Sequence, residues 1–457
     1  MSDDKTAWPS FPLGEVCRTT SGGTPSRKRA DYFLGDIPWV KSGELTDGLV
    51  SEVSEFITEE AVSNSSAKLF PRGTLLIAMY GATVGKLGVL VNPAATNQAV
   101  CAIFLPPELD SKFLFWFLRF KRNYLIDQAV GGAQPNISQT ILRELMVPVP
   151  PIDLQIETVA EIEKQFSRLD EAVANLQRVK ANLKRYKASV LKAAVEGRLV
   201  ETEASIAQRE GRSYETGEQL LQRILEERRA QWAGKGKYKE PELPVLDGLN
   251  SLPEGWVYAT TEQMCEQIAS GSTPSPDAMF SGAGDVPFLK VYNLTFDGSL
   301  DFTLKPTYVA DTTHQGLLAR SRSIPGDVLM NIVGPPLGKV SIVPSTFPEW
   351  NINQAIVTFR TLPGLVNRLL AHWLLAQPVL SRLERTAKAT AGQHNLQVST
   401  CRKLPIPIPP LAEQARIVAE VDRHLSIICE VEAEVDANLK RSQALRQVTL
   451  QRAFAQG

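Results

Sequence analysis

The stretch Val147-Pro-Val-Pro-Pro151 separates two kinds of sequence, and it returns later in the chain as Ile406-Pro-Ile-Pro-Pro410. In both places, short apolar runs rich in β-forming residues come before it and a long helical pattern comes after it. Proline fits the first turn of a helix, because the N–H group that it lacks would have no partner there anyway. Each stretch therefore predicts the end of a globular part and the start of a helix.

The apolar residues after Pro151 alternate at spacings of three and four, which is typical of a coiled-coil helix. The pattern runs toward Gly197, and at 1.5 Å per residue such a helix is roughly 65 to 70 Å long. The second copy repeats the pattern toward Gly457. Neither apolar seam can bury itself, so we predict that the two helices pair antiparallel; the alternative is that each packs on its own globular domain. The seam includes Ile156, Phe166, Leu169, Leu176, Val421, Leu425 and Ile428, and a family resemblance carried by other blocks of the chain makes these residues candidates for docking other subunits.

The globular parts also repeat, block by block and in the same order. Ser21-Gly-Gly-Thr-Pro-Ser26 matches Ser270-Gly-Ser-Thr-Pro-Ser275, and Asp36-Ile-Pro-Trp-Val-Lys41 matches Asp285-Val-Pro-Phe-Leu-Lys290. Two copies exclude a solenoid and favour a molecule with pseudo-twofold symmetry. The other matched blocks are Gly81–Lys86 with Gly334–Lys339, Asn97-Gln98 with Asn353-Gln354, and Val159–Glu161 with Val418–Glu420.

These patterns predict a mixed α+β fold with two similar globular α/β domains, related by pseudo-twofold symmetry and separated by two long antiparallel coiled-coil helices. A unique connector lies between the copies and contains a charged amphipathic helix at Thr216–Trp232. Its alternating charges favour a solvated helix, with docking of Leu220, Ile224 and Trp232 on a partner or a neighbouring helix as the alternative. The predicted domains are globular parts 1–150 and 251–409, long helices 151–197 and 410–457, and connector 198–250.

Composition excludes several classes of function. Forty-nine basic against fifty acidic side chains give a net charge of −1, which by itself indicates neither a nucleic-acid nor a membrane partner. Without a membrane-spanning run or a signal peptide, we expect a cytoplasmic protein. The five cysteines form no CxxC pair and the four histidines form no metal-binding spacing. Gly81–Lys86 has too few residues between its glycines for a phosphate-binding loop. We therefore predict a binding protein with no catalytic residue, no metal and no bound cofactor.

Two similar modules on a rigid spacer suit a target that has two patches and its own approximate twofold symmetry, as double-stranded DNA does. Positive charge would then be local, and Arg27-Lys-Arg29 and Arg119-Phe-Lys-Arg122 are candidates for phosphate contacts. Residues common to both modules can support folding or contact the DNA backbone. The two modules can read different bases only through residues that differ between them. The candidate DNA-binding residues are Thr24, Arg27, Lys28, Arg29, Lys41, Tyr80, Lys86, Asn97 and Gln98 in the first module and Thr273, Lys290, Lys339, Asn353, Gln354, Gln393 and His394 in the second.

The ordered set of residues 19–29 and 36–45, the Gly-Lys and Asn-Gln blocks, and Pro409–Val418 resembles the type I restriction-modification specificity subunit. The connector followed by Leu252-Pro-Glu-Gly-Trp256 is similar to that family as well. The resemblance implies two target-recognition domains, each reading one half of a bipartite site, with helices that set the spacer and dock two methylation subunits. It also implies restriction subunits in the full complex and S-adenosylmethionine on the methylation subunits. The first copy departs from the family pattern at Leu154, where the second copy has Glu413.

One alternative from another class is a self-contained DNA methyltransferase or nuclease with an unrecognised catalytic site. Methyl transfer by the purified chain alone would establish it. A second alternative is a coiled-coil scaffold without a role on DNA. DNA binding that weakens steeply with salt would exclude the scaffold.

Overall fold

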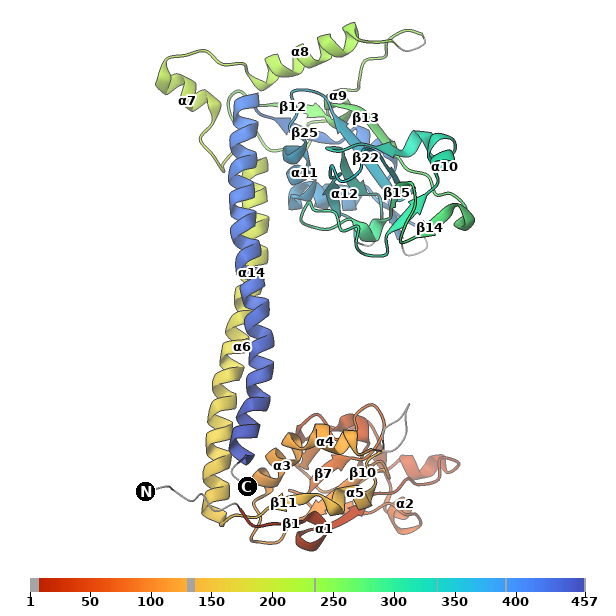
Figure 1. Ribbon diagram of the computed structural model, residues 1–457, viewed down its shortest axis with the longest axis vertical. Helices are drawn as coiled ribbons and strands as arrows, with labels where there is room; N and C mark the ends of the chain where they lie inside the picture. Colours follow the sequence, from red (N-terminus) through yellow and green to blue (C-terminus); the bar gives the residue numbers. More distant parts are fainter. Residues whose placement is uncertain (1–7, 130–135, 234–235, 335, 391–392, 456–457) are drawn as a thin grey trace. The chain divides into compact units, whose positions relative to one another are not determined.

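The computed structural model shows two compact units, each combining a globular module with a stretch of paired helices (Figure 1). Unit 1 is Met1–Arg178 with Val435–Gly457, and unit 2 is Val179–Glu434. The long helices α6 (Ile152–Val195) and α14 (Leu411–Phe454) have 44 residues each and contribute to both units. None of the helices in the described part of the chain is long and apolar enough to cross a membrane. The structure describes residues 8–129, 136–233, 236–334, 336–390 and 393–455.

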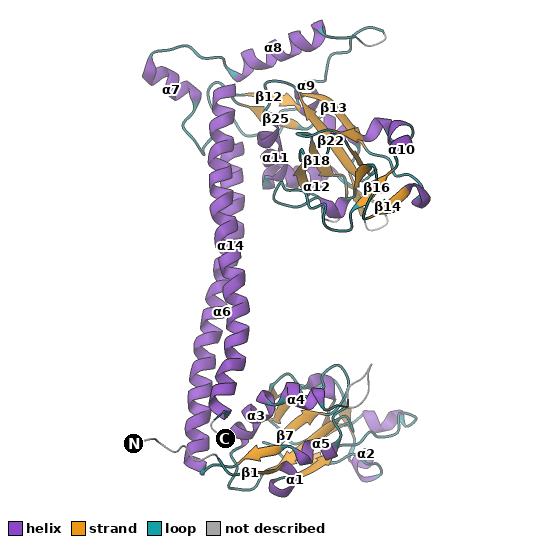
Figure 2. Ribbon diagram, in the orientation of Figure 1, coloured by secondary structure: helices purple, strands orange, loops and turns teal. Residues whose placement is uncertain are grey.

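The first module is made of β-sheets flanked by short helices (Figure 2). Its strands are β1 (Ser10–Pro12), β2 (Arg18–Ser21), β3 (Ile37–Val40), β4 (Gly48–Val50), β5 (Phe56–Ile57), β6 (Leu69–Phe70), β7 (Leu75–Ala78), β8 (Leu87–Leu90), β9 (Ala94–Thr96), β10 (Val100–Phe104) and β11 (Met146–Pro148). Its helices are α1 (Leu13–Val16), α2 (Glu59–Ser63), α3 (Ser111–Phe120), α4 (Arg122–Asp127) and α5 (Gln139–Glu144). One sheet has the order β2-β10-β7-β8-β4 and another β5-β3-β9-β6, with β3 and β9 parallel.

The continuous apolar run of β7 follows from its position in the middle of the larger sheet. Leu75 and Ile77 point to one core cluster, which also contains α3 residues, whereas Leu76 and Ala78 point to a second cluster on the other face. Successive side chains of a strand alternate between faces, so a strand covered on both faces is apolar throughout. The strand β7 is therefore fully buried.

The second module repeats this topology. Its strands are β12 (Val257–Thr260), β13 (Cys265–Ser270), β14 (Met279–Ser281), β15 (Val286–Leu289), β16 (Thr307–Val309), β17 (Arg322–Ser323), β18 (Val328–Asn331), β19 (Val333–Gly334), β20 (Val340–Ile342), β21 (Trp350–Ile352), β22 (Ile356–Thr361), β23 (Lys388–Thr390), β24 (Gln393–Asn395) and β25 (Pro405–Ile408). Its helices are α9 (Thr261–Met264), α10 (Asp311–Gln315), α11 (Asn367–Leu375), α12 (Gln377–Thr386) and α13 (Val398–Arg402). The order β13-β22-β18-β20 repeats β2-β10-β7-β8, and the parallel pair β15 and β21 repeats β3 and β9. The prediction of two similar α/β modules and two long helices is confirmed.

Each long helix begins with a buried glutamine that binds the backbone of its own module. The Nε2 group of Gln155 donates to two backbone carbonyls at 2.7 and 2.9 Å, and its Oε1 accepts from the amide of Asp110 at 2.8 Å. Gln414 repeats these contacts at 3.1, 2.9 and 3.0 Å, the last with the amide of Val366. Both side chains are fully buried. One side chain in each copy therefore fixes the start of the helix against the globular module.

Replacing either glutamine with alanine is expected to lower the free energy of unfolding of its unit by about 2 to 4 kcal/mol, because buried backbone groups lose their partners. Hydrogen–deuterium exchange should then be faster at the Asp110 amide in Gln155→Ala and at the Val366 amide in Gln414→Ala. Gln451→Ala, at an exposed position on α14, is the control and should change neither amide. Unchanged protection in both glutamine variants would contradict the assignment.

The connector holds α7 (Glu203–Glu210) and α8 (Gly217–Ala230). Leu220 and Ile224 are buried in the core of the second module, so the prediction of a solvated helix is wrong for the apolar face of α8. Trp232 remains half-exposed beside Tyr238. The reason lies in the chain at Gly364: a Cβ there would be 2.6 Å from Cδ1 of Ile224, so glycine leaves the space that α8 fills.

Glu413 ties the connector to α14 in unit 2. Its buried carboxylate accepts hydrogen bonds from the amide of Glu203 at 2.8 Å and from Nε1 of Trp256 at 3.0 Å. Burial raises the pKa of Glu413, and these two donors act against that effect. Leu154, which occupies the corresponding place in the first copy, is 42% exposed. The difference between the copies therefore marks where the connector is anchored.

The predicted docking seam is largely used within the chain. Phe166, Val421 and Ile428 are 6%, 0% and 2% exposed, and the Phe166 ring packs edge-on against Trp116 at a centroid distance of 4.9 Å. The structure corrects the docking expectation for these three residues, because their own units bury them. Ile156 is 54% exposed. The candidates Leu169, Leu176 and Leu425 are half-buried.

Candidate nucleic-acid interface

The Ser-Gly-x-Thr-Pro turn packs against the end of a central strand in each module. A Cβ on Gly22 would lie 2.1 Å from the carbonyl oxygen of Thr96 at the end of β9. A Cβ on Gly271 would lie 2.0 Å from the carbonyl oxygen of Ile352 at the end of β21. No side chain fits at these distances, so the glycine of the repeated block is required by this close approach.

The threonine of the same turn binds the glutamine of the Asn-Gln block. The Oγ1 group of Thr24 donates to Oε1 of Gln98, and Thr273 donates to Oε1 of Gln354 in the same way. Two blocks that are far apart in sequence therefore meet at one point in each module. The side chains of both glutamines are also exposed, so this point lies at the surface.

The asparagine of the Asn-Gln block binds the neighbouring parallel strand. The amides of Asn97 and Asn353 donate to the carbonyls of Val40 and Leu289 at 2.9 and 3.0 Å. In both modules the side-chain Oδ1 atom is buried and accepts no hydrogen bond from the described residues. Since a buried acceptor without a donor costs about 1 to 3 kcal/mol, its presence in both copies indicates a shared constraint on this loop.

The basic loop of the first module is exposed and ion-paired. Residues Arg27–Arg29 are all exposed. Glu55 binds Arg27 at 2.7 Å and Lys41 at 2.8 Å, and these two cations hold the pKa of its carboxyl below its usual range. Arg29 pairs with two further carboxylates at 2.6 and 3.2 Å. Exposed ion pairs contribute only about 0 to 1 kcal/mol, so a phosphate can replace such carboxylates at low cost.

The Gly81–Lys86 loop connects β7 and β8 beside this surface. The ammonium group of Lys86 lies 3.6 Å from the carboxylate of Asp47 and is part-exposed. Tyr80, which precedes the loop, is half-buried and binds Gln98, and burial raises the pKa of its hydroxyl. Gly81 and Gly85 have φ of 90° and 75°, so they serve a tight strand connection.

The second module has fewer cations at the corresponding place. The counterpart of Arg27–Arg29 is Pro276–Ala278, a short 3-10 helix. Lys290 is half-buried, and the ammonium group of Lys339 donates to the Val291 carbonyl at 3.2 Å. The candidates Gln393 and His394 lie on β24, where His394 pairs with Gly334 of β19. The side chains of Gln393 and His394 lie outside the described part of the structure.

The first-module candidates form several separate groups of contacts. Hydrogen bonds and ion pairs join Thr24, Tyr80 and Gln98, and separately Arg27 and Lys41 through Glu55. Lys86 is held by Asp47 instead. The sequence interpretation missed the roles of Glu55 and Asp47, because nothing near either carboxylate in the sequence indicates its distant cation.

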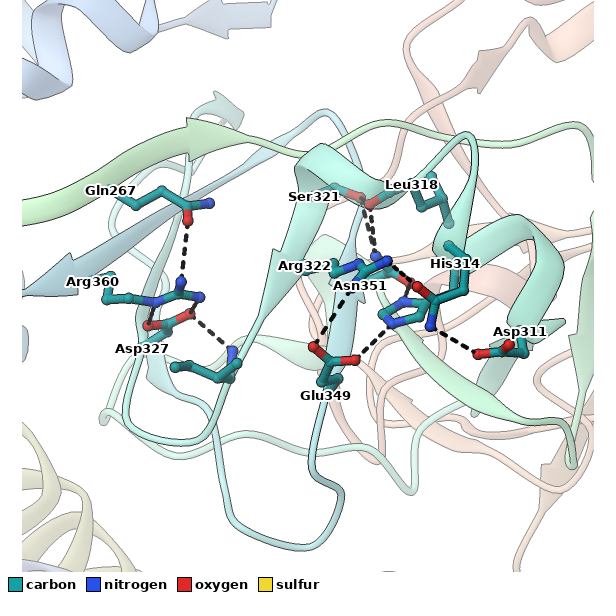
Figure 3. Close-up of polar contacts among 12 residues, drawn as sticks. Gln267, Asp311, His314, Leu318, Ser321, Arg322, Asp327, Glu349, Asn351 and Arg360 are labelled. Carbon is teal, nitrogen blue, oxygen red and sulfur yellow. Dashed lines mark hydrogen bonds and ion pairs between the residues drawn. The ribbon is translucent and has the colours of Figure 1, made fainter. Parts of the chain in front are cut away.

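The second module contains a buried polar cluster around His314 (Figure 3). His314 is 1% exposed; its Nδ1 lies 2.7 Å from Oδ1 of Asn351 and its Nε2 lies 2.9 Å from Oε2 of Glu349. Nearby, Arg360 binds Asp327 through two hydrogen bonds at 2.8 and 2.9 Å. Neither ring nitrogen of His314 is free for substrate. The described residues contain no group of three or more His, Cys, Asp or Glu side chains that could hold a metal ion.

Comparison with known sequences gives a consistent family. The model of the type I restriction modification DNA specificity domain matches residues 5–185 and 253–441. The EcoKI specificity subunit of Escherichia coli (strain K12) is 22% identical over an alignment of 467 positions, gaps included. The alignment covers 98% of this chain and 88% of that protein. The MjaIX specificity subunit of Methanocaldococcus jannaschii is 30% identical over 169 residues, or 36% of this chain and 39% of that protein. The EcoR124I/EcoR124II specificity subunit of Escherichia coli is 28% identical over 35% of this chain and 41% of that protein. The last two matches thus span about two fifths of those relatives.

Solved structures show the same fold along the chain. A chain from a structure on complex assembly and conformational transition of the type I R-M system has a TM-score of 0.66 and 19% identity, with 98% of each chain covered. The HsdS subunit from Thermoanaerobacter tengcongensis has a TM-score of 0.56 and 18% identity, over 98% of this chain and 97% of that one. Since the family model matches both modules and most of both long helices, this chain belongs to the type I restriction modification DNA specificity domain family.

Proposed function

We propose that this chain is the DNA-specificity subunit of a type I restriction-modification complex. Residues 1–150 and 251–409 each read one half of a bipartite target in double-stranded DNA. The observation that carries the proposal is that the modules share a framework, including the Thr–Gln contact of the turn, but differ in the exposed residues beside it. A shared framework with different surfaces suits recognition of two different half-sites.

Recognition in the first module rests on the loop Arg27–Arg29 and on Lys41. The cations of Arg27, Arg29 and Lys41 are held in position by carboxylates that a DNA phosphate can displace. The ring of Phe33 lies 4.3 Å from the guanidinium carbon of Arg27 and restricts the directions that this side chain can take. The second module has Pro276–Ala278 in the same place and must contact its half-site through other residues.

Catalysis belongs to partner subunits in this proposal. Two methylation subunits carry S-adenosylmethionine, and restriction subunits join them. A methyltransferase must turn its target base out of the duplex, which costs a few kcal/mol. A separate reader that fixes the position on the duplex lets one catalytic subunit serve many targets. The helices at 151–197 and 410–457 set the spacer, and their exposed faces, including Ile156, are available to the methylation subunits.

The test is the set of methylated bases in host DNA with and without this gene. We expect one bipartite motif to disappear when the gene is deleted. Methyl transfer by the purified chain alone would instead support the alternative of a self-contained methyltransferase. If no motif disappears on deletion and DNA binding is also insensitive to salt, the proposal is contradicted.

A triple variant tests whether the basic loop contacts the phosphates of DNA. Alanine at Arg27, Lys28 and Arg29 together should weaken binding of the assembled complex to all sequences and reduce the slope of log affinity against log salt by about 2 to 3. Alanine at Lys237 and Lys239, exposed in the connector, is the matched control. A slope that is unchanged in the triple variant would place the phosphate contacts elsewhere.

A further inference from the structure

Three arginines converge on one pocket in unit 1. The pocket has a volume of about 550 Å³ and lies between α4 with the end of α3, on one side, and α6 and α14 on the other. Arg119 and Arg122 reach it from the module, and Arg446 reaches it from α14. Its polar lining also includes the amide side chains of Asn123, Gln443 and Gln447. No carboxylate lines this pocket, so its polar surface consists of cations and amide groups.

The cations lie close enough to repel one another. The guanidinium carbon of Arg119 is 5.0 Å from the ring centroid of Trp116 and 5.7 Å from that of Phe166. The guanidinium carbon of Arg446 is also 5.7 Å from the Phe166 centroid. Burial lowers the pKa of Arg119, and the positive charges of Arg122 and Arg446 lower it further, whereas the carboxylates of Asp47 and Asp170 act in the opposite direction. A bound anion would relieve this repulsion.

Carboxylates of the protein neutralise the positive charge of the three arginines only in part. Arg122 pairs with Asp47, and Arg446 pairs with Asp170. Both carboxylates stand outside the pocket lining. For Arg119, the described residues show ring contacts and neither a hydrogen bond nor an ion pair. One guanidinium is thus held beside the pocket by aromatic rings, with its N–H groups available to a ligand.

The second copy lacks this cluster. The contacts of Gln155 and Gln414 align Asp110 with Val366, which places Leu375 opposite Arg119 and Pro378 opposite Arg122. The same alignment of the long helices places Lys187 opposite Arg446. A cluster required by the shared framework would be present in both copies. The three arginines therefore serve something particular to unit 1.

We propose that this pocket binds a phosphate group. Guanidinium groups present forked pairs of N–H donors that match the oxygens of phosphate, and an anion with two charges offsets more of the repulsion than one carboxylate does. The source of the phosphate is either the backbone of bound DNA or a free phosphorylated molecule. The DNA source rests on the proposed function; the free source does not.

Two measurements on the full chain separate these sources. In the first, pyrophosphate is titrated calorimetrically, and we expect saturable binding that weakens by at least about tenfold in Arg119→Gln and in Arg446→Gln. In the second, binding to the target duplex is measured against salt, and a backbone phosphate predicts weaker binding of both variants with a slope reduced by about 1. Arg452→Gln, exposed on α14 and absent from the pocket lining, is the control for both.

The outcomes are distinct. Loss of pyrophosphate binding with unchanged DNA affinity assigns a free phosphorylated ligand, whereas weakened DNA binding assigns the backbone. If the wild-type chain binds no pyrophosphate and both variants bind DNA as it does, the phosphate site is overturned. A chain that binds no DNA at all contradicts the proposed function but leaves the pyrophosphate titration to decide this inference. Arg446, one-third exposed, gives a result even if Arg119→Gln fails to fold.

Discussion

Replacing Glu413 with alanine is expected to lower the free energy of unfolding of unit 2 by about 3 kcal/mol, because two buried donors lose their acceptor at a cost of roughly 1 to 3 kcal/mol each. The donors are the amide of Glu203 and Nε1 of Trp256. The raised pKa of Glu413 shows that burying its charge is itself unfavourable, so removing that charge offsets part of the loss. The loss still dominates, since both N–H groups stay buried in the variant.

The measurement is urea unfolding, together with hydrogen exchange at the start of α7. We expect faster exchange at the Glu203 amide in Glu413→Ala. The internal duplication supplies the matched control: Leu154→Ala changes the corresponding position of the first copy, which is exposed, and should alter stability by less than about 0.5 kcal/mol. Equal effects of the two substitutions would show that Glu413 does not anchor the connector.

The duplication made much of the fold predictable from sequence. Gly22 and Gly271 are both glycine because a Cβ at either place would overlap a strand carbonyl. The constraint is the same in both copies, so the same residue appears in both. The blocks around them therefore appear twice in the same order. Their contact partners could not be read from the sequence, because the Thr–Gln contact of each module joins blocks that are far apart in it.

The burial of individual helix residues was less predictable. Heptad spacing identified the seam of α6, yet Phe166 is also covered by Trp116, which comes from the globular module. The apolar face of α8 was expected in solvent, because its charges alternate. The space for Ile224 is created by Gly364, far away in sequence, and no local pattern shows that.

The sequence predicted the basic residues of the candidate interface and not the acidic residues that pair with them. The run Arg27–Arg29 is visible in the sequence, whereas the carboxylate of Glu55 joins it only in the folded module. The arginine pocket is similar: Arg119 and Arg446 belong to opposite ends of the chain and meet at the ring of Phe166. Pairing between distant residues is a property of the fold, and a single sequence does not record it.

Inserting seven residues into each long helix, after Arg178 and after Glu434, is expected to weaken binding of the assembled complex to its native target by at least about 100-fold. These positions lie where the chain divides into its two units, and both helices are continuous there. Seven residues make two turns of a coiled coil, so the apolar seam stays in phase and both units keep their internal contacts. Each helix gains about 10 Å, or roughly three base-pair steps of DNA.

Affinities for a series of targets with central spacers of increasing length measure this effect. We expect the best spacer to become longer, but with incomplete recovery of affinity. Three added base pairs also rotate the second half-site by more than a quarter of a turn, whereas a heptad leaves the helix face nearly unchanged. Seven residues inserted after Gly236, in the connector, should leave the preferred spacer as it is. The same preferred spacer in the helix variant as in the wild type would show that the helices do not set the distance between half-sites.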